Sequence, residues 1–169
     1  TTGVNLANAL TVASGNLTIQ GSSLVGGIAT PLAGSSATGS RYGFSTAAAG
    51  DITVSGNISL AGTSVTFMGG YLLGDVLSTD GNVALTGSGL YAMSLSAPVT
   101  AGTGANPRTL TITTTGSNGY GLNTAAAAAL SATGSIALTS YATIGASGIS
   151  IAAPIRSTLR GDVVISSYA

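Results

Sequence analysis

The feature that most constrains this chain is a run of short alternating segments that begin at glycine and do not close into a hairpin. In residues 50–67, GDITVSGNISLAGTSVTF, apolar and small polar residues alternate almost without interruption. A period of two is typical of a β-strand with one buried face. The opening Gly50-Asp51-Ile52 returns six residues later as Gly56-Asn57-Ile58, with no two-residue hairpin turn between them. The pattern favours strands that follow one another without reversing direction.

The same alternation recurs along the whole chain. Each segment is about four to six residues long and sends aliphatic side chains to one face and Ser, Thr or Asn to the other. We expect strands at 16–20, 51–55, 57–60, 64–67, 82–86, 109–113, 135–139, 148–152 and 162–166. Helical periodicity is nearly absent, and the alanine run at 125–129 lacks an amphipathic face. The sequence therefore predicts an all-β fold.

Many of these segments open in the same way, with glycine followed by Asn, Asp or Ser. Glycine bends the backbone at no steric cost, and the short polar side chain can bond the neighbouring backbone at a corner. The openers are Gly15-Asn16, Gly50-Asp51, Gly56-Asn57, Gly81-Asn82, Gly134-Ser135 and Gly161-Asp162. We interpret Gly50 and Gly81, 31 residues apart, and Gly134 and Gly161, 27 residues apart, as equivalent positions of successive repeats.

A pair of similar six-residue segments also supports a repeat. Ser94-Leu-Ser-Ala-Pro-Val99 returns 56 residues later as Ser150-Ile-Ala-Ala-Pro-Ile155, which is twice 28. Repeats of roughly 25–30 residues with two or three short strands each are typical of a solenoid. We therefore predict a right-handed parallel β-helix (β-solenoid), because parallel crossovers are almost always right-handed. Residues 1–169 would form a single β-solenoid domain, suited to be a segment or a subunit of a longer fibre.

An antiparallel β-sandwich is the alternative fold. It requires turns that reverse the chain every 8–12 residues or so. Asp80-Gly81 and Asn118-Gly119 are the only Asp-Gly or Asn-Gly dipeptides in the chain. The scarcity of reversing turns favours the solenoid.

The composition argues against several classes of function. The chain contains four basic and four acidic residues, no His and no Cys, and its formal net charge is zero. Nucleic-acid binding normally requires a basic surface, and no apolar run approaches the length of a membrane-spanning helix, so we expect neither a nucleic-acid partner nor a membrane span. Without His or Cys, a zinc site and a disulfide are excluded, and we expect no metal and no cofactor.

Few residues of this chain could act as an acid, a base or a nucleophile in catalysis. Glycoside hydrolysis needs two carboxyl groups across a cleft, and the chain has only four Asp. Asp51 and Asp162 open strands at corners, whereas Asp75 and Asp80 flank a segment that we interpret as a loop in which the two could approach each other. With no His, Lys or Glu to complete an acid–base pair, we expect no catalytic residues and no enzyme activity.

The strand openers, together with Leu95-Ser-Ala-Pro-Val99 and Ile151-Ala-Ala-Pro-Ile155, resemble the repeats of filamentous haemagglutinin-like exoproteins and autotransporter passengers. The background of Ser, Thr, Ala and Gly without Cys is similar too. The resemblance implies a secreted β-helix at the surface of Gram-negative bacteria, associated with the outer membrane. Such proteins serve in surface filaments, adhesion and biofilm-type aggregation. We therefore expect a structural, non-catalytic protein; the alternative is an adhesin module that binds surface glycans or a host receptor.

Three sets of residues are candidate sites. Arg160-Gly161-Asp162 spells an integrin-recognition tripeptide, which adhesins of the resembled family can carry, although Gly161-Asp162 is also a corner opener. Asn16 and Asn57 lie in glycosylation sequons. The ends of a solenoid expose strand edges and an open core, and neither end of this sequence offers charges or a capping helix. We therefore expect head-to-tail self-association, or coverage by a longer chain, through Val4, Leu6, Val163, Val164, Ile165 and Tyr168.

Overall fold

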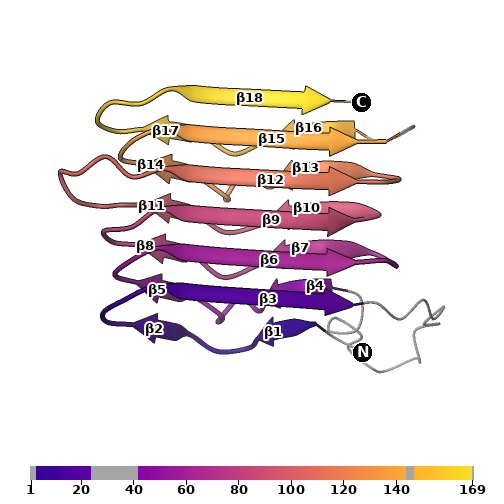
Figure 1. Cartoon of the computed structure of the whole chain (residues 1–169), viewed down its shortest axis with the longest axis horizontal. Coiled ribbons are helices and arrows are strands. Elements are labelled where there is room, and N and C mark those ends of the chain that lie inside the picture. Colours follow the sequence, from indigo (N-terminus) through magenta and orange to yellow (C-terminus); the bar gives the residue numbers. More distant parts are fainter. Residues whose placement is uncertain (1–2, 24–41, 144–146, 169) are drawn as a thin grey trace.

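The computed structural model describes residues 3–23, 42–143 and 147–168. In this part of the chain, eighteen strands form three six-stranded sheets, and there is no helix. Three strands make one coil, and each coil lies on the one before it (Figure 1). Every strand pair is parallel, with pairing of β3 to β6, β6 to β9 and β9 to β12 in one sheet as examples. The parallel β-solenoid is confirmed, and the antiparallel sandwich is wrong.

Each coil contributes one strand to each of three sheets, here named sheets A, B and C. Sheet A contains β1 (Val4–Leu6), β4 (Tyr42–Thr46), β7 (Met68–Leu72), β10 (Tyr91–Leu95), β13 (Tyr120–Thr124) and β16 (Ser147–Ile151). Sheet B contains β2 (Leu10–Val12), β5 (Ile52–Val54), β8 (Val76–Ser78), β11 (Val99–Ala101), β14 (Leu130–Ala132) and β17 (Ile155–Ser157). Sheet C contains β3 (Leu17–Ser23), β6 (Ile58–Ser64), β9 (Val83–Gly89), β12 (Leu110–Gly116), β15 (Ile136–Ala142) and β18 (Val163–Tyr168).

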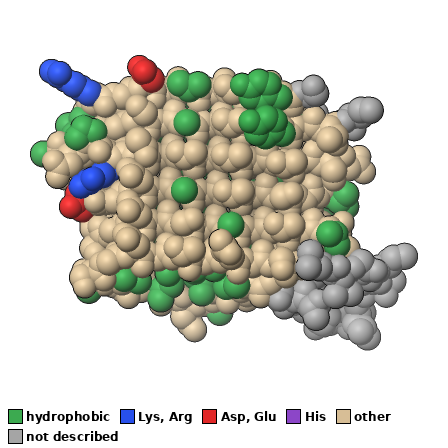
Figure 2. Space-filling view, viewed as in Figure 1, with side chains coloured by type: hydrophobic (Ala, Val, Ile, Leu, Met, Phe, Trp, Pro, Cys, Tyr) green, Lys and Arg blue, Asp and Glu red, His purple; other side chains and the backbone are tan. Residues whose placement is uncertain are grey.

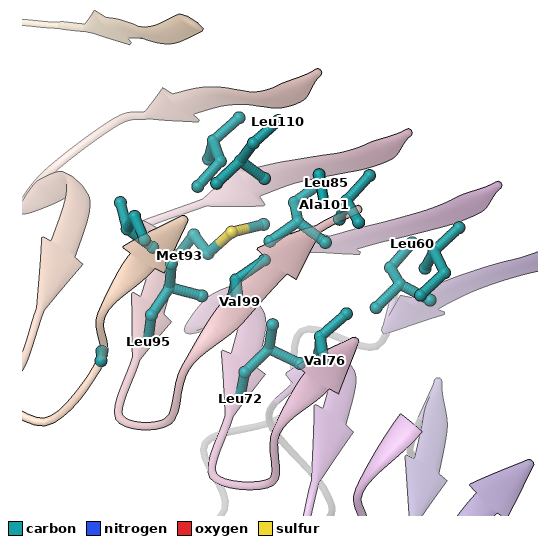
Figure 3. Close-up of a cluster of buried hydrophobic side chains, with 14 of the residues drawn as sticks. Leu60, Leu72, Val76, Leu85, Met93, Leu95, Val99, Ala101 and Leu110 are labelled. Atoms are coloured by element: carbon teal, nitrogen blue, oxygen red, sulfur yellow. The ribbon is translucent and has the colours of Figure 1, made fainter. Parts of the chain in front are cut away.

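The core is a set of aliphatic columns that run along the stack. Along sheet C, in-register pairing places Val83 on Ile58 and Leu110 on Val83, and all three side chains are buried. Sheets A and B add further buried residues, among them Leu72, Leu95 and Val99, so that the interior is filled from three sides (Figure 3). Burying these side chains is the main favourable contribution to folding, at about 25 cal/mol per Å² of apolar surface.

The spacing of the coils agrees with the expected repeat, with one correction. From β6 onwards, consecutive equivalents in sheet C, such as Ile58 with Val83 and Ile136 with Val163, are 25 to 27 residues apart, whereas Leu17 and its partner Ile58 are 41 apart. The pairing of Gly134 with Gly161 is confirmed by their close backbone contact. The pairing of Gly50 with Gly81 is wrong, because Gly50 stacks against Gly74. In the coils of β4–β6 and β7–β9, two adjacent corners open with glycine (Gly50 and Gly56, Gly74 and Gly81), and the motif alone does not distinguish them.

The predicted strand at 64–67 is also wrong beyond its first residue. β6 ends at Ser64, and residues 65–67 form a bend that leads into β7. The Ser64 hydroxyl accepts hydrogen bonds from the backbone N–H groups of Thr66 and Phe67, at 3.4 and 3.1 Å. A serine that bonds the backbone two and three residues ahead favours a turn over continued extension.

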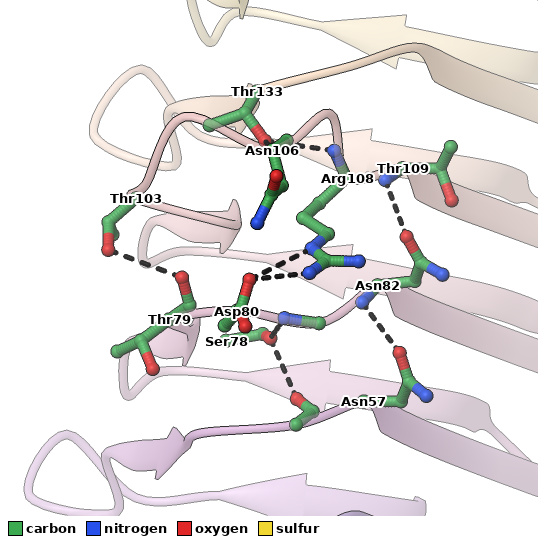
Figure 4. Close-up of polar contacts among 12 residues, drawn as sticks. Asn57, Ser78, Thr79, Asp80, Asn82, Thr103, Asn106, Arg108, Thr109 and Thr133 are labelled. Atoms are coloured by element: carbon green, nitrogen blue, oxygen red, sulfur yellow. Dashed lines mark hydrogen bonds and ion pairs between the residues drawn. The ribbon is translucent and has the colours of Figure 1, made fainter.

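The corner before sheet C explains why these strands open with Asn or Asp. The N–H of Asn57 donates to Asn16 Oδ1 at 2.8 Å. The N–H of Asn82 donates to Asn57 Oδ1 and that of Thr109 to Asn82 Oδ1, each also at 2.8 Å (Figure 4). Further along the stack, the N–H of Asp162 donates to Ser135 Oγ at 3.2 Å. We call this column the corner ladder; its members are Asn16, Asn57, Asn82, Thr109, Ser135 and Asp162. In four of the five steps along this column, a short side chain with an acceptor oxygen links one coil to the next.

Glycine precedes every ladder residue except Thr109, which follows Arg108, and at Gly56, Gly81 and Gly161 the coils approach closely. A Cβ atom at Gly81 would collide with the backbone carbonyl of Gly56 on the coil beneath, and one at Gly161 with the carbonyl of Gly134. A positive φ is not the general reason: among the described residues only Gly15 and Gly102 adopt one. The expected role of these glycines at the corner is thus correct, but the physical cause at Gly81 and Gly161 is crowding between coils.

Replacing Asn82 by Ala removes an acceptor from the corner ladder and leaves the N–H of Thr109 without its partner. We expect the free energy of unfolding to fall by about 0.5–1.5 kcal/mol, the net value of one hydrogen bond. Asn82→Asp keeps an acceptor oxygen and should remain close to the parent protein at neutral pH. Urea unfolding followed by circular dichroism measures both variants. An equal loss in the two variants would contradict the role given to the ladder.

Candidate functional site

The last coil carries an unusual set of exposed apolar side chains. β18 is the edge strand of sheet C and pairs only with β15. Val163 and Ile165 stack on Ile136 and Leu138, which are completely buried, and therefore point towards the interior. They are nevertheless 45% and 50% exposed, because no described coil lies over them. We call the surface formed by the free edges of β16, β17 and β18 the C-terminal face.

The opposite end of the stack has the same construction. Leu17 and Ile19 of β3 pair in register with the buried Ile58 and Leu60, yet both are only partly buried. Val4 and Leu6 of β1 are in the same situation. We call the surface formed by β1, β2 and β3 the N-terminal face. In Figure 2, hydrophobic side chains gather along the top and the bottom of the stack, whereas the broad side between them is mostly small and polar.

The six residues predicted for the head-to-tail interface are divided between these faces and the side of the stack. Val4 and Leu6 lie on the N-terminal face, and Val163 and Ile165 on the C-terminal face. Val164 and Tyr168 alternate with the inward residues of β18 and lie on the outer surface of sheet C. There, Tyr168 stacks on Tyr141 of the coil beneath, with ring centroids 5.2 Å apart.

The Arg160-Gly161-Asp162 tripeptide lies at the exposed corner before β18. Its backbone is held as a ladder corner: the Asp162 N–H donates to Ser135 Oγ, and the Asp162 carbonyl accepts from the Ile136 N–H at 2.9 Å. Both charged residues are exposed, and the backbone of Gly161 packs closely against that of Gly134. Recognition by a receptor stays a prediction.

The two sequon asparagines are members of the corner ladder. Asn16 and Asn57 are exposed, and each uses its Oδ1 atom to accept an N–H from the next coil. Their Nδ2 groups, to which a glycan would be attached, make no hydrogen bond with another described residue. Glycosylation likewise stays a prediction.

The segment between Asp75 and Asp80 was interpreted as a loop, but it contains the extended strand β8. The two residues have different partners. The Asp75 N–H donates to Asp51 Oδ1 at 3.0 Å, whereas Asp80 Oδ1 accepts from Arg108 Nη2 at 2.5 Å and Nε at 3.2 Å (Figure 4). Within 3–23, 42–143 and 147–168, no three acidic, His or Cys side chains could hold a metal ion together.

Sequence reasoning missed a group of aromatic residues on the outer side of sheet A. Tyr42 and Tyr71 lie on β4 and β7, and their rings stack with centroids 5.1 Å apart. Phe67 contacts both Tyr42 and Tyr91 edge to face. Tyr91 and Tyr120 occupy the first positions of adjacent strands, a signal that becomes readable once the coil length is known.

Comparison with known proteins found no matching family, no similar curated protein and no similar solved structure. The described residues include no helix long and apolar enough to cross a membrane. The fold is therefore established from the structure alone, and the resemblance to haemagglutinin-like exoproteins contributes to a proposal only.

The ion pair of Asp80 and Arg108 generates a pH prediction. The hydrogen bond and the positive charge of Arg108 lower the pKa of the Asp80 carboxyl below its usual value near 3.8. A carboxyl whose pKa is lowered by folding contributes stability above its unfolded pKa and loses that contribution as the pH falls through its folded pKa. We expect the parent protein to be slightly more stable than Asp80→Asn at pH 7, and the difference to disappear on acidification below about pH 4.

Urea midpoints measured from pH 7 to pH 2 test this expectation. Arg108→Gln and the double variant complete a mutant cycle that isolates the pair from other effects of each substitution. Because Asp80 is well exposed, added salt should also reduce the coupling. A coupling that grows on acidification would contradict the assigned cause.

Proposed function

We propose that this chain is a non-catalytic structural segment or subunit of an extracellular bacterial surface filament or adhesin, assembled by head-to-tail stacking of solenoid ends. The observation that carries the proposal is the half-exposure of Val163 and Ile165, which point into a core that no described coil closes on this side. Exposed strand edges with apolar side chains are a known route to association. Natural proteins that remain monomeric protect such edges.

The two faces match because all coils share one layout. Sheets A, B and C begin with β1, β2 and β3 and end with β16, β17 and β18, in that order, and all pairing is parallel. A second copy that places β1–β3 over β16–β18 continues all three sheets without a change of direction. Such a contact joins two different surfaces and leaves one of each free, so it propagates into a filament.

Apolar burial supplies the driving force. Stacking would cover Val163, Ile165 and the partly buried Ile149, Ile151 and Ile155 of the C-terminal face. On the N-terminal face it would cover Val4, Leu6, Val12, Leu17 and Ile19. The backbone groups at the edges of six strands would find partners in the same step. With a formal net charge of zero, little electrostatic repulsion opposes this association.

The corner ladder sets the register of the contact. Asp162 is its last member, and its carboxylate accepts no hydrogen bond from a described residue. Asn16 is its first member, and its backbone N–H has no acceptor among the described residues. Placing Asn16 of the second copy over Asp162 continues the ladder and places Leu17 over Val163 and Ile19 over Ile165. Polar and apolar columns then continue together.

The expected location and partners follow from the same features. A chain with so few charges and no Cys is typical of exported bacterial surface proteins, and the resemblance to haemagglutinin-like exoproteins supports a place outside the outer membrane. The proposal needs no cofactor, metal or nucleic acid. It assigns structural tasks to the carboxylates of Asp51 and Asp80, which are engaged by the Asp75 N–H and by Arg108. Surface glycans or a host receptor would then bind along the side of the filament.

Electron microscopy and analytical ultracentrifugation of the purified chain test the assembly. We expect fibres whose width equals one solenoid, and a sedimentation coefficient that rises with concentration. Ile165→Lys places a charge in the C-terminal face and should abolish assembly. Val65→Lys is the matched control, because Val65 is similarly exposed, at 52%, but lies in the bend after β6. A monomer at high concentration, or equal behaviour of the two variants, would refute the proposal.

Disulfide trapping tests the register, and the chain is well suited to it because it contains no cysteine. In the proposed register, Thr18 of one copy lies beside Val164 of the next, both on the outer surface of sheet C. We expect Thr18→Cys/Val164→Cys to form covalent polymers on mild oxidation, since adjacent parallel strands bring Cα atoms within disulfide range. Gln20→Cys/Val164→Cys, shifted by two residues, should cross-link much more slowly. Faster cross-linking of the shifted pair would exclude this register and leave the filament proposal standing.

A further inference from the structure

A small pocket opens on the outer side of sheet A, between the two end faces. Its volume is about 270 Å³, and its lining includes Phe67, Met68, Tyr91, Ser94, Tyr120 and Asn123. These residues come from three consecutive coils, through β7, β10 and β13 and the bend before β7. The pocket therefore exists only when the coils are stacked.

Stacking places an aromatic pair beside a polar pair. Ser94 on β10 and Asn123 on β13 are direct neighbours in the register of sheet A, and Tyr91 and Tyr120 lie three residues earlier on the same two strands. The Tyr91 ring is fixed from two sides: Phe67 contacts it edge to face at 5.4 Å, and the backbone of Gly119 packs so closely against it that a Cβ there would collide. Tyr120 is 45% exposed. The Tyr91 side of the aromatic wall is held in place before any ligand arrives.

The polar side of the pocket has unused hydrogen-bonding capacity. Neither the Asn123 amide nor the Ser94 hydroxyl bonds another described residue, although both line the pocket. An amide offers two donors and an acceptor, and a hydroxyl offers one donor and an acceptor. None of the lining residues is charged. A ligand that matches this lining is neutral, has an apolar surface for the tyrosines and carries several hydroxyl groups.

We propose that this pocket binds one ring of a neutral saccharide. A pyranose has a C–H face that packs on an aromatic ring and hydroxyl groups at its rim that bond an amide and a serine. The volume is slightly below the roughly 300–1,000 Å³ of ordinary ligand pockets, which suits a single ring. A quaternary ammonium group also prefers aromatic walls, but it would leave Asn123 and Ser94 without partners.

The proposal does not depend on filament formation. The pocket lies on the side of the stack, and none of its lining residues belongs to the N-terminal or C-terminal face. In a filament it would recur once per subunit along the side, so a weak single-site affinity would be multiplied for a polymeric glycan. The monomeric chain would still bind a single ring.

Saturation-transfer NMR on the full chain, with methyl glycosides of neutral hexoses at millimolar concentration, tests the site. We expect transfer to the ring C–H protons of at least one glycoside. Tyr120→Ala and Asn123→Ala should each weaken binding about tenfold, as expected for a central contact. Tyr141→Ala is the matched control, because Tyr141 is 48% exposed but lies on sheet C, and its binding should equal that of the parent.

The outcomes separate the alternatives. Circular dichroism establishes that each variant is folded, and Tyr120→Phe, which keeps the ring, should retain most of the binding. The absence of saturation transfer to every one of the glycosides would overturn the proposal. So would an equal loss in Tyr141→Ala, or binding of choline chloride with no binding of any glycoside. None of these results bears on filament formation, which microscopy reports separately.

Discussion

The structure depends on one constraint, the in-register stacking of successive coils at the spacing of parallel strands. At about 4.8 Å per step, each position on a coil is in contact with the same position of the coils before and after it. A column therefore has to be filled by residues that suit one another. Ile58, Val83 and Leu110 satisfy this in the core, and Asn16, Asn57 and Asn82 satisfy it at the corner.

The same constraint explains how a chain with so few charges can fold with a single register between its coils. Hydrogen bonds of the corner ladder run along the stack and penalise any slip of one coil against the next, because a slip removes acceptors from several N–H groups at once. In this fold, the repeated hydrogen bonds fix the register of the coils, a task that charged pairs perform in many other proteins. At the last described coil, the Asp162 carboxylate accepts no hydrogen bond from a described residue, and Val163 and Ile165 are half exposed. The sides of the stack are free for other tasks, such as the pocket beside Tyr120.

Sheet C could be predicted almost completely from the sequence, whereas sheets A and B could not. All six sheet C strands appear among the expected segments, because one face of each strand points to the core and the other points to solvent. The strands of sheet B have three residues each, for example Val76–Ser78, which is too short for a reliable alternation. In sheet A, Gly69 interrupts the pattern of β7 because a Cβ there would collide with the backbone of Ser88 and the carbonyl of Gly62, both in sheet C. Glycine within a strand marks this close backbone approach, not a turn.

By itself, the sequence determined the all-β class, the repeat of about 25–30 residues, the inward and outward faces of the sheet C strands and the scarcity of side chains suited to catalysis or metal binding. These properties are local, since they follow from period-two alternation, glycine corners and composition. Only the tertiary structure decided that Gly74 rather than Gly81 follows Gly50, that Asp80 pairs with Arg108 and not with Asp75, and that Tyr91 and Tyr120 meet beside Ser94 and Asn123. The physical reason is that each of these contacts joins residues about one coil apart. The length of a coil depends on how its corners pack, and a short stretch of sequence does not contain that information.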